Sequence, residues 1–290
     1  MKFSLPKILL PLDFSKKDIN AARYAIQLGE AFEARITLLH VLTQHYGFDM
    51  PGFENEELSG FLSENENNAQ KQLDAFLKRG FRDLKVKRVL VKGDPAREIV
   101  RYAHSEKFNL IVMPTHGHGP FRRRLLGSVT AKVLHDVNIP VLTGVHIEKP
   151  VTGKSTSLRQ IVCAIDLGPD SERTLRWASG LGSRFNSVVT AVHVVASFEF
   201  PGEGYGPPGW TRLAREKLMS SVAKLLRKCE VDAQIHLEAG DVPEALCSAA
   251  TKLRANLLVI GRGPLTGASE RLSTNAYAII RKSPCAVVSV

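Results

Sequence analysis

The chain has 290 residues, of which 44% are hydrophobic and 23% charged, and these values predict a soluble globular protein of two domains. No apolar stretch approaches the roughly 20 residues that cross a bilayer, so we expect a cytoplasmic protein without a secretory signal or membrane anchor. The net charge of +10 is spread evenly, with 22 basic against 17 acidic residues up to Pro150 and 17 against 12 after it. Nucleic-acid binders concentrate positive charge near aromatic side chains. Only 7% of the residues of this chain are aromatic and its charge is spread evenly, so we expect no nucleic-acid partner.

The first half of the chain alternates apolar strands with amphipathic helices. A strand ends at Leu12, and Ser15 is suited to cap a helix over residues 16–31 whose apolar face contains Ile19, Ala22, Ala25 and Ile26. The elements expected after it are strands at 35–41, 85–91, 109–113 and 139–145, helices at 62–79, 95–106 and 128–135, and a loop at 44–60. This order predicts an α/β fold with a doubly wound parallel sheet and right-handed crossovers.

A glycine-containing loop between the strand at 109–113 and the helix that begins at Ser128 carries the clearest functional signal. The first N–H groups of a helix have no partner within it, so an anion placed there is bound by the backbone. Gly117 and Gly127 are separated by nine residues, and Ser128 and Thr130 add hydroxyl donors. Asp13 follows the first strand, whose carboxyl end shares an edge of the sheet with this loop. The alternative is a structural glycine turn before a Ser-capped helix, with Asp13 ordering its own turn.

The run Gly117, nine residues, then Gly127-Ser128-Val129-Thr130 resembles the phosphate loop of the universal stress protein family. The usual pattern is Gly-x-x-Gly, nine residues, then Gly-Ser or Gly-Thr, and here Pro114 replaces the first glycine. The resemblance implies ATP or another adenine nucleotide, with magnesium, and a role in the stress response. It also implies Rossmann-like (HUP-type) domains, each a five-stranded parallel sheet with helices on both faces.

Residue by residue, the resemblance assigns the two ends of the nucleotide to different side chains. Asp13 and Val41 would recognise the adenine and ribose, with Pro11 and Met113 packing nearby. The phosphates would lie on backbone N–H groups and two hydroxyls. His116 fits the family loop. The residues implied for phosphate binding are Gly117, Gly127, Ser128, Val129 and Thr130.

The second half repeats the first, which indicates a domain duplication. Asp13 corresponds to Asp166, and Leu39-His40-Val41 to Val192-His193-Val194. We therefore predict a first domain at residues 1–146, a linker at 147–157 and a second domain at 158–290. The second loop, which begins Gly261-Arg262-Gly263, has Ser273 where glycine is expected. We expect this degenerate loop to form a structural turn with Thr274 as a helix cap. Whether the second domain binds a ligand stays an open question.

Similar proteins dimerise through the last strand, so the resemblance implies that residues 139–145 and 285–290 pair within one chain as a pseudo-dimer. A homodimer and unidentified protein partners are further expectations. His116 and His118 lack a third nearby ligand, so we predict no metal site there. The four cysteines are widely spaced and expected to be buried thiols.

No Walker lysine, carboxylate pair or catalytic triad is evident around the loop, so we assign no catalytic residues. Three hypotheses follow. The first is a nucleotide-dependent stress regulator. The second is a nucleotide-independent scaffold, and the third is an adenylyl- or phosphoryl-transfer enzyme. Slow ATP hydrolysis or self-phosphorylation on Ser128 or Thr130 is the most enzymatic activity that we expect.

Overall fold

The computed structural model describes residues 3–43, 55–116, 126–144, 158–195, 210–262 and 274–290, which form two compact units. The first unit takes most of its residues from the chain before Pro140, and the second runs from Pro140 to Val290. The boundary lies within a few residues of the strand expected at 139–145, while the expected linker at 147–157 is outside the described residues.

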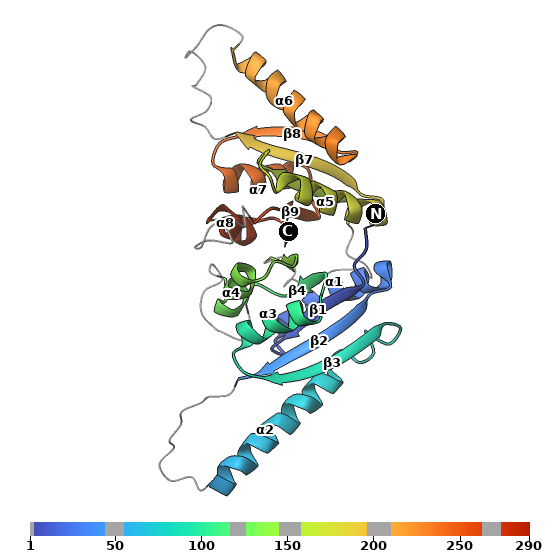
Figure 1. The fold of residues 1–290 in the computed structure, drawn as a ribbon, viewed down its shortest axis with the longest axis vertical. Helices are drawn as coiled ribbons and strands as arrows, with labels where there is room; N and C mark the ends of the chain where they lie inside the picture. The colour runs from blue at the N-terminus through green and yellow to red at the C-terminus, as the bar shows by residue number, and fades with distance from the viewer. Residues whose placement is uncertain (1–2, 44–54, 117–125, 145–157, 196–209, 263–273) are drawn as a thin grey trace. The chain divides into compact units, whose positions relative to one another are not determined.

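The first unit is a parallel sheet with the strand order β3-β2-β1-β4 (Figure 1). Strands β1 and β4 are buried almost throughout, as expected for central strands covered on both faces. Helix α1 packs on β1, β2 and β4, and α3 packs on β2 and α4. The elements are β1 (Lys7–Leu12), α1 (Lys16–Phe32), β2 (Arg35–Leu42), α2 (Asn55–Ala75), β3 (Lys85–Lys92), α3 (Pro95–Ser105), β4 (Leu110–Val112) and α4 (Ser128–Asp136).

The second unit has the strand order β8-β7-β6-β9-β10, in which β8-β7-β6-β9 corresponds strand by strand to β3-β2-β1-β4. Its neighbouring strands are again parallel. Strand β5 (Val141–Thr143) joins it antiparallel to β10, with Leu142 opposite Val288. The predicted pairing of the last strands of the two repeats is therefore confirmed, as is the mostly parallel α/β fold. The remaining elements are β6 (Gln160–Ile165), α5 (Ser171–Phe185), β7 (Val188–Val195), α6 (Trp210–Cys229), β8 (Gln234–Ala239), α7 (Val242–Lys252), β9 (Leu257–Ile260), α8 (Thr274–Lys282) and β10 (Ala286–Ser289).

An asparagine sets the start of the central strand pair in each repeat. Asn109 Oδ1 accepts a hydrogen bond from Lys7 N, and Asn256 Oδ1 accepts one from Gln160 N, both at 3.0 Å. These bonds tie the loop before β4 to β1 and the loop before β9 to β6. The register of the two central strands, and with it the position of their carboxyl ends, is thereby held in the same way in both repeats.

Two details of the first helix differ from the sequence predictions. Ser15 occupies the N-cap position of α1, but its hydroxyl makes no capping bond. Ile19, expected on the buried face, is 39% exposed, whereas Asp18 is only 1% exposed. The reason is that Asp18 turns toward the end of β1, which rotates Ile19 outward. In addition, helix α2 begins at Asn55, earlier than the predicted residue 62.

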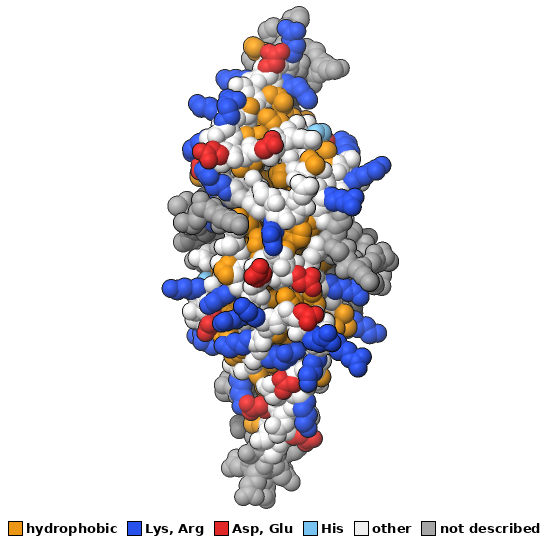
Figure 2. Space-filling model, turned by 90° about the vertical axis from the view of Figure 1, so that its right-hand side faces the viewer, with side chains coloured by type: hydrophobic (Ala, Val, Ile, Leu, Met, Phe, Trp, Pro, Cys, Tyr) orange, Lys and Arg blue, Asp and Glu red, His pale blue; other side chains and the backbone are white. Residues whose placement is uncertain are grey.

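The cysteines are mostly buried, as predicted. Cys163, Cys229 and Cys285 are buried free thiols, and Cys247 is partly buried. None of the helices in the described ranges has the length and apolar character needed to span a membrane. On the face drawn in Figure 2, acidic side chains lie among the basic ones.

Candidate functional site

The residues predicted to hold the adenine and ribose lie at one edge of the first sheet. Strand β1 pairs in parallel with β2, where Leu12 is opposite His40, and with β4, where Leu9 is opposite Ile111. The carboxyl ends of the three strands therefore meet at the point where the strand order reverses, which is where open α/β sheets bind ligands. The predicted residues carried to this edge are Pro11, Val41 and Met113, all buried, and Asp13, which is half-buried.

The start of α4 is joined to the end of β4 by two hydrogen bonds. Gly127 N donates to Thr115 O at 2.8 Å, and Thr130 Oγ1 donates to Pro114 O at 3.0 Å. Pro114 lacks an N–H group, but its carbonyl anchors the helix. The Thr130 hydroxyl is buried and its proton is already donated, so it differs from the free hydroxyl expected from the sequence. Gly117, another of the five expected phosphate residues, lies outside the described residues.

Three backbone donors remain at the N-terminus of α4. The first bond within the helix runs from Ala131 N to Gly127 O at 2.9 Å. The N–H groups of Ser128, Val129 and Thr130 therefore precede the first helical acceptor, and no partner for them is found among the described residues. Ser128 is exposed. The site can thus offer three N–H groups and the positive end of a helix dipole to an anion.

Gly127 permits a close approach between α4 and the loop after β4. A Cβ atom built at Gly127 would lie 3.2 Å from Thr115 O and 3.4 Å from His116 Cα, which are both backbone atoms. A side chain at this position would press on the loop. His116 is half-buried, with Nδ1 2.9 Å from Thr115 Oγ1, so it belongs to the same loop framework.

A pair of carboxyl groups lies at the end of β1. Asp13 N donates to Asp18 Oδ2 at 2.9 Å, and the two side chains are also hydrogen-bonded to each other. Burial, the Asp13 charge and this hydrogen bond raise the pKa of Asp18 to about 8. At neutral pH the pair therefore holds one proton and one negative charge. Asp13 Oδ1 also accepts from Ser15 N at 3.0 Å, which fixes the direction of the carboxylate.

An aromatic pair borders the acid pair. Phe14 has a φ of 64°, and this left-handed conformation places its ring 4.4 Å from the ring of His40, measured between centroids. His40 Nδ1 lies 2.8 Å from Leu12 O, and because a carbonyl only accepts, Nδ1 carries the hydrogen. Burial lowers the pKa of His40, so the ring is neutral at pH 7. Sequence reasoning missed Asp18, Phe14 and His40 as site residues, although His40 stood within the repeated Leu39-His40-Val41.

Comparison with known proteins identifies the family. The family model described as "Universal stress protein family" matches residues 5–143 and 157–290. The chain belongs to the universal stress protein family. Universal stress protein MJ0531 of Methanocaldococcus jannaschii is 32% identical over 145 residues, which cover 50% of this chain and 82% of that protein. Universal stress protein MJ0577 of the same organism is 32% identical over 165 residues, covering 49% of this chain and 96% of that protein.

Among solved structures, a universal stress protein from Archaeoglobus fulgidus DSM 4304 superposes with a TM-score of 0.70 and covers 99% of this chain and 98% of that one. Their sequence identity is 20%, so this likeness concerns the fold. The two matched segments of the family model confirm that this universal stress protein is a tandem of two family domains.

The second universal stress protein domain reproduces the strand-end arrangement with different side chains. Leu167 has a φ of 62°, and His193 Nδ1 lies 2.9 Å from Ile165 O, as His40 does from Leu12 O. Ser171 takes the place of Asp18: its Oγ accepts from Asp166 N at 3.3 Å and donates to Asp166 Oδ1 at 2.7 Å. A hydroxyl thus makes the two bonds that the buried carboxyl group makes in the first domain.

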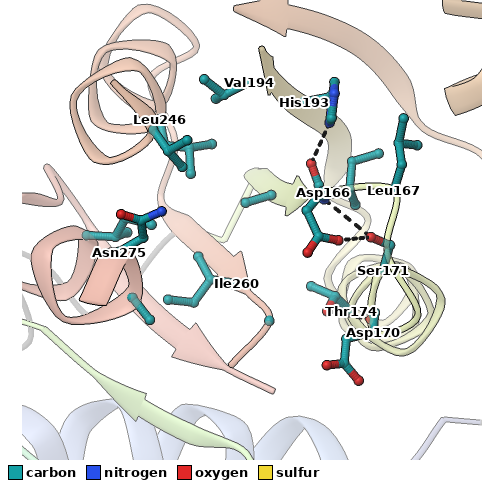
Figure 3. A pocket seen from close by; sticks show the side chains of 16 residues that line it. Asp166, Leu167, Asp170, Ser171, Thr174, His193, Val194, Leu246, Ile260 and Asn275 are labelled. Carbon is teal, nitrogen blue, oxygen red and sulfur yellow. Dashed lines mark hydrogen bonds between the residues drawn. The ribbon is translucent and has the colours of Figure 1, made fainter. Parts of the chain in front are cut away.

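A cavity of about 590 Å³ opens at the carboxyl ends of β6, β7 and β9 in this second domain (Figure 3). Gly261 stands at its rim, at the position of Pro114 in the first repeat. Arg262, the next residue, is 3% exposed and bonds Ser289 through Nε and Nη2, so its guanidinium is turned into the core. Burial and the nearby Arg173 lower the pKa of Arg262 to about 9. The polar residues that line the cavity are Asp166, Asp170, Ser171, Thr174, His193 and Asn275.

Proposed function

We propose that the first domain of this universal stress protein binds ATP and acts as a nucleotide-dependent regulator in the stress response. The observation that carries the proposal is the set of three N–H groups at Ser128, Val129 and Thr130, which have no hydrogen-bond partner within the described ranges and begin the helix that follows β4. Gly127 supports it, because the absence of a side chain lets the start of α4 lie tightly against the backbone of Thr115 and His116 at the end of β4.

The strand-end residues would recognise the rest of the nucleotide. Asp13 presents a carboxylate whose direction is fixed by Ser15 N and Asp18, and such an acceptor suits the hydroxyl and amino donors of an adenine nucleoside. Pro11, Val41 and Met113, which are buried apolar residues at the same strand ends, would pack against a flat ring. His116 would remain part of the loop, and Gly117 would contribute its N–H group as in the family pattern.

Magnesium would enter with the phosphates. In the described part of the chain, His, Cys, Asp and Glu side chains do not gather in any group of three that could hold a metal ion. We propose that ATP carries the magnesium ion and that the protein supplies the N–H groups. Because the Thr130 hydroxyl donates to Pro114 O, its contribution to phosphate binding would come from its backbone N–H.

We further propose domains at residues 1–146 and 158–290, a cytoplasmic protein, and a surface that changes on nucleotide binding and is read by protein partners or by a second copy. We propose no catalytic residue. A ligand can shift a conformational equilibrium without any chemical step, provided that it binds one state better.

Calorimetric titration of ATP with magnesium into the intact chain tests the proposal. We expect one ATP per chain and weaker binding of adenosine in the first domain, because adenosine cannot use the α4 donors. A chain that remains folded but releases no heat and shows no thermal stabilisation with millimolar ATP would favour the nucleotide-independent scaffold. Turnover of ATP that depends on an acceptor substrate would favour the transferase.

A further inference from the structure

The cavity of the second domain has the size and position of a ligand site. Its volume of about 590 Å³ falls within the range of small-molecule sites, and it lies outside the carboxyl ends of β6, β7 and β9 where the strand order reverses. The described residues that line it all belong to the unit that runs from Pro140 to Val290.

Gly261 is one of the residues that line this cavity. A Cβ atom built at Gly261 would lie 3.3 Å from Thr174 Oγ1 and 3.8 Å from Asp170 Cβ, so Gly261 faces the first turn of α5 across a narrow gap. In the first repeat Pro114 occupies this position and places a ring there. The glycine leaves space between the end of β9 and α5 that a larger residue would fill.

The polar wall of the cavity is acidic. Asp166 Oδ1 accepts from Gly168 N at 2.8 Å and from Ser171 Oγ at 2.7 Å. Figure 3 shows the other carboxylate oxygen of Asp166 pointing away from Ser171, toward the open space. Asp170 lines the same side of the cavity, and within the described ranges neither lysine nor arginine does. Two carboxylates without a lining cation oppose a phosphate or carboxylate and favour hydroxyl or amino donors.

The remaining wall is apolar and comes from several elements. It includes side chains at the ends of β6, β7 and β9 and on α7 and α8, so a ring or an aliphatic body can be enclosed opposite the carboxylates. Asn275, near the start of α8, adds an amide at the far side in Figure 3. The apolar lining residues that bear on this argument are Ile165, Val194, Leu246, Ile260 and Ile279.

From these features we infer that the second domain is a separate binding site for an unphosphorylated ligand of nucleoside size, held through hydroxyl or amino donors on Asp166 and Asp170. The two domains then respond to different molecules. The first takes a nucleotide through the N-terminus of α4, and the second takes a neutral or cationic compound that lacks phosphates. This inference does not depend on the first domain binding ATP.

Adenosine is the probe for the test, with ATP as its phosphorylated counterpart. The Gly127→Asp chain serves as background so that first-domain phosphate binding is removed. We expect this chain to bind adenosine at least about 10-fold more tightly than ATP. Asp166→Asn in the same background should weaken adenosine at least about 10-fold, because an Asn side chain keeps the acceptor for Gly168 N and Ser171 Oγ but turns a donor toward the cavity.

Two controls locate the site. Asp232→Asn removes an equal charge from an exposed position of the second domain outside the cavity lining and should leave adenosine binding unchanged. Asp13→Asn, the matching change in the first domain, should reduce only the weaker adenosine binding proposed there and leave the tighter binding event in place. The inference is overturned if adenosine fails to bind at millimolar concentration, if ATP binds as tightly, or if Asp13→Asn rather than Asp166→Asn abolishes the tighter binding event.

Discussion

Replacing Gly127 with aspartate is expected to weaken ATP binding by more than 100-fold. The new carboxylate would stand at the N-cap of α4, where it can accept hydrogen bonds from the same N–H groups that we assign to the phosphates. It would also add a negative charge beside the triphosphate. Both effects act against the ligand, while an aspartate at the N-cap favours the helix itself. Titration of the variant with ATP and magnesium measures the loss.

Gly127→Ala is the matched control for this change. It brings the same Cβ atom, 3.2 Å from Thr115 O, but no carboxylate. Because the loop must yield by only a few tenths of an ångström, we expect a loss of less than about 10-fold. If alanine and aspartate weaken ATP equally, the effect is steric and the N-terminus of α4 is not the anion site. If neither weakens it, the nucleotide lies elsewhere.

The second large effect is a dependence of the free energy of unfolding on pH, which we attribute to the proton on Asp18. The folded-state pKa of Asp18 is raised from 3.8 to about 8, so the folded chain holds a proton that the unfolded chain has released between these values. The free energy of unfolding therefore falls as pH rises from about 4 to about 8. Asp18→Asn mimics the protonated carboxyl group, since an amide can both donate to Asp13 and accept from Asp13 N. We expect the variant to match the parent near pH 4 and to be more stable at pH 8, by on the order of a few kcal/mol.

Urea unfolding of both chains at several pH values measures this difference. Asp83→Asn, at a side chain that is 90% exposed, is the matched control and should shift stability by no more than about 0.5 kcal/mol at every pH. A difference between Asp18→Asn and the parent that stays constant from pH 5 to pH 9 would mean that Asp18 does not hold the proton. The second domain already carries an uncharged equivalent, since Ser171 makes the corresponding two bonds to Asp166.

The sequence predicted most of the fold because its strands are strongly apolar and its repeat is long. The order of strands and helices, the tandem of two domains and the pairing of β5 with β10 were all expected and are confirmed. Ile19 was misplaced because helical periodicity alone does not set the rotation of a helix. That rotation depends on the contact of Asp18 with the end of β1, which is a tertiary interaction.

Sequence alone could predict only those site residues that stand directly after a strand or directly before a helix. Asp13 after a strand, and Gly127 before a helix, could be found in this way. Asp18 could not, because an acidic residue in the first turn of a helix is also typical of a favourable dipole contact at an exposed position. The second-domain cavity was not predicted either. It depends on Gly261 standing opposite Thr174, and only the folded chain brings these residues together.

Amide hydrogen exchange of the intact chain, resolved to single residues by NMR with and without ATP and magnesium, tests the central claim most directly. We predict that ATP slows exchange at Ser128, Val129 and Thr130, the three N–H groups that precede the first hydrogen bond within α4, and that the corresponding amides at the start of α8 are unchanged. Protection by ATP at Asn275 and Ala276 instead, or saturation with ATP that leaves all three α4 amides exchanging as before, would contradict the account.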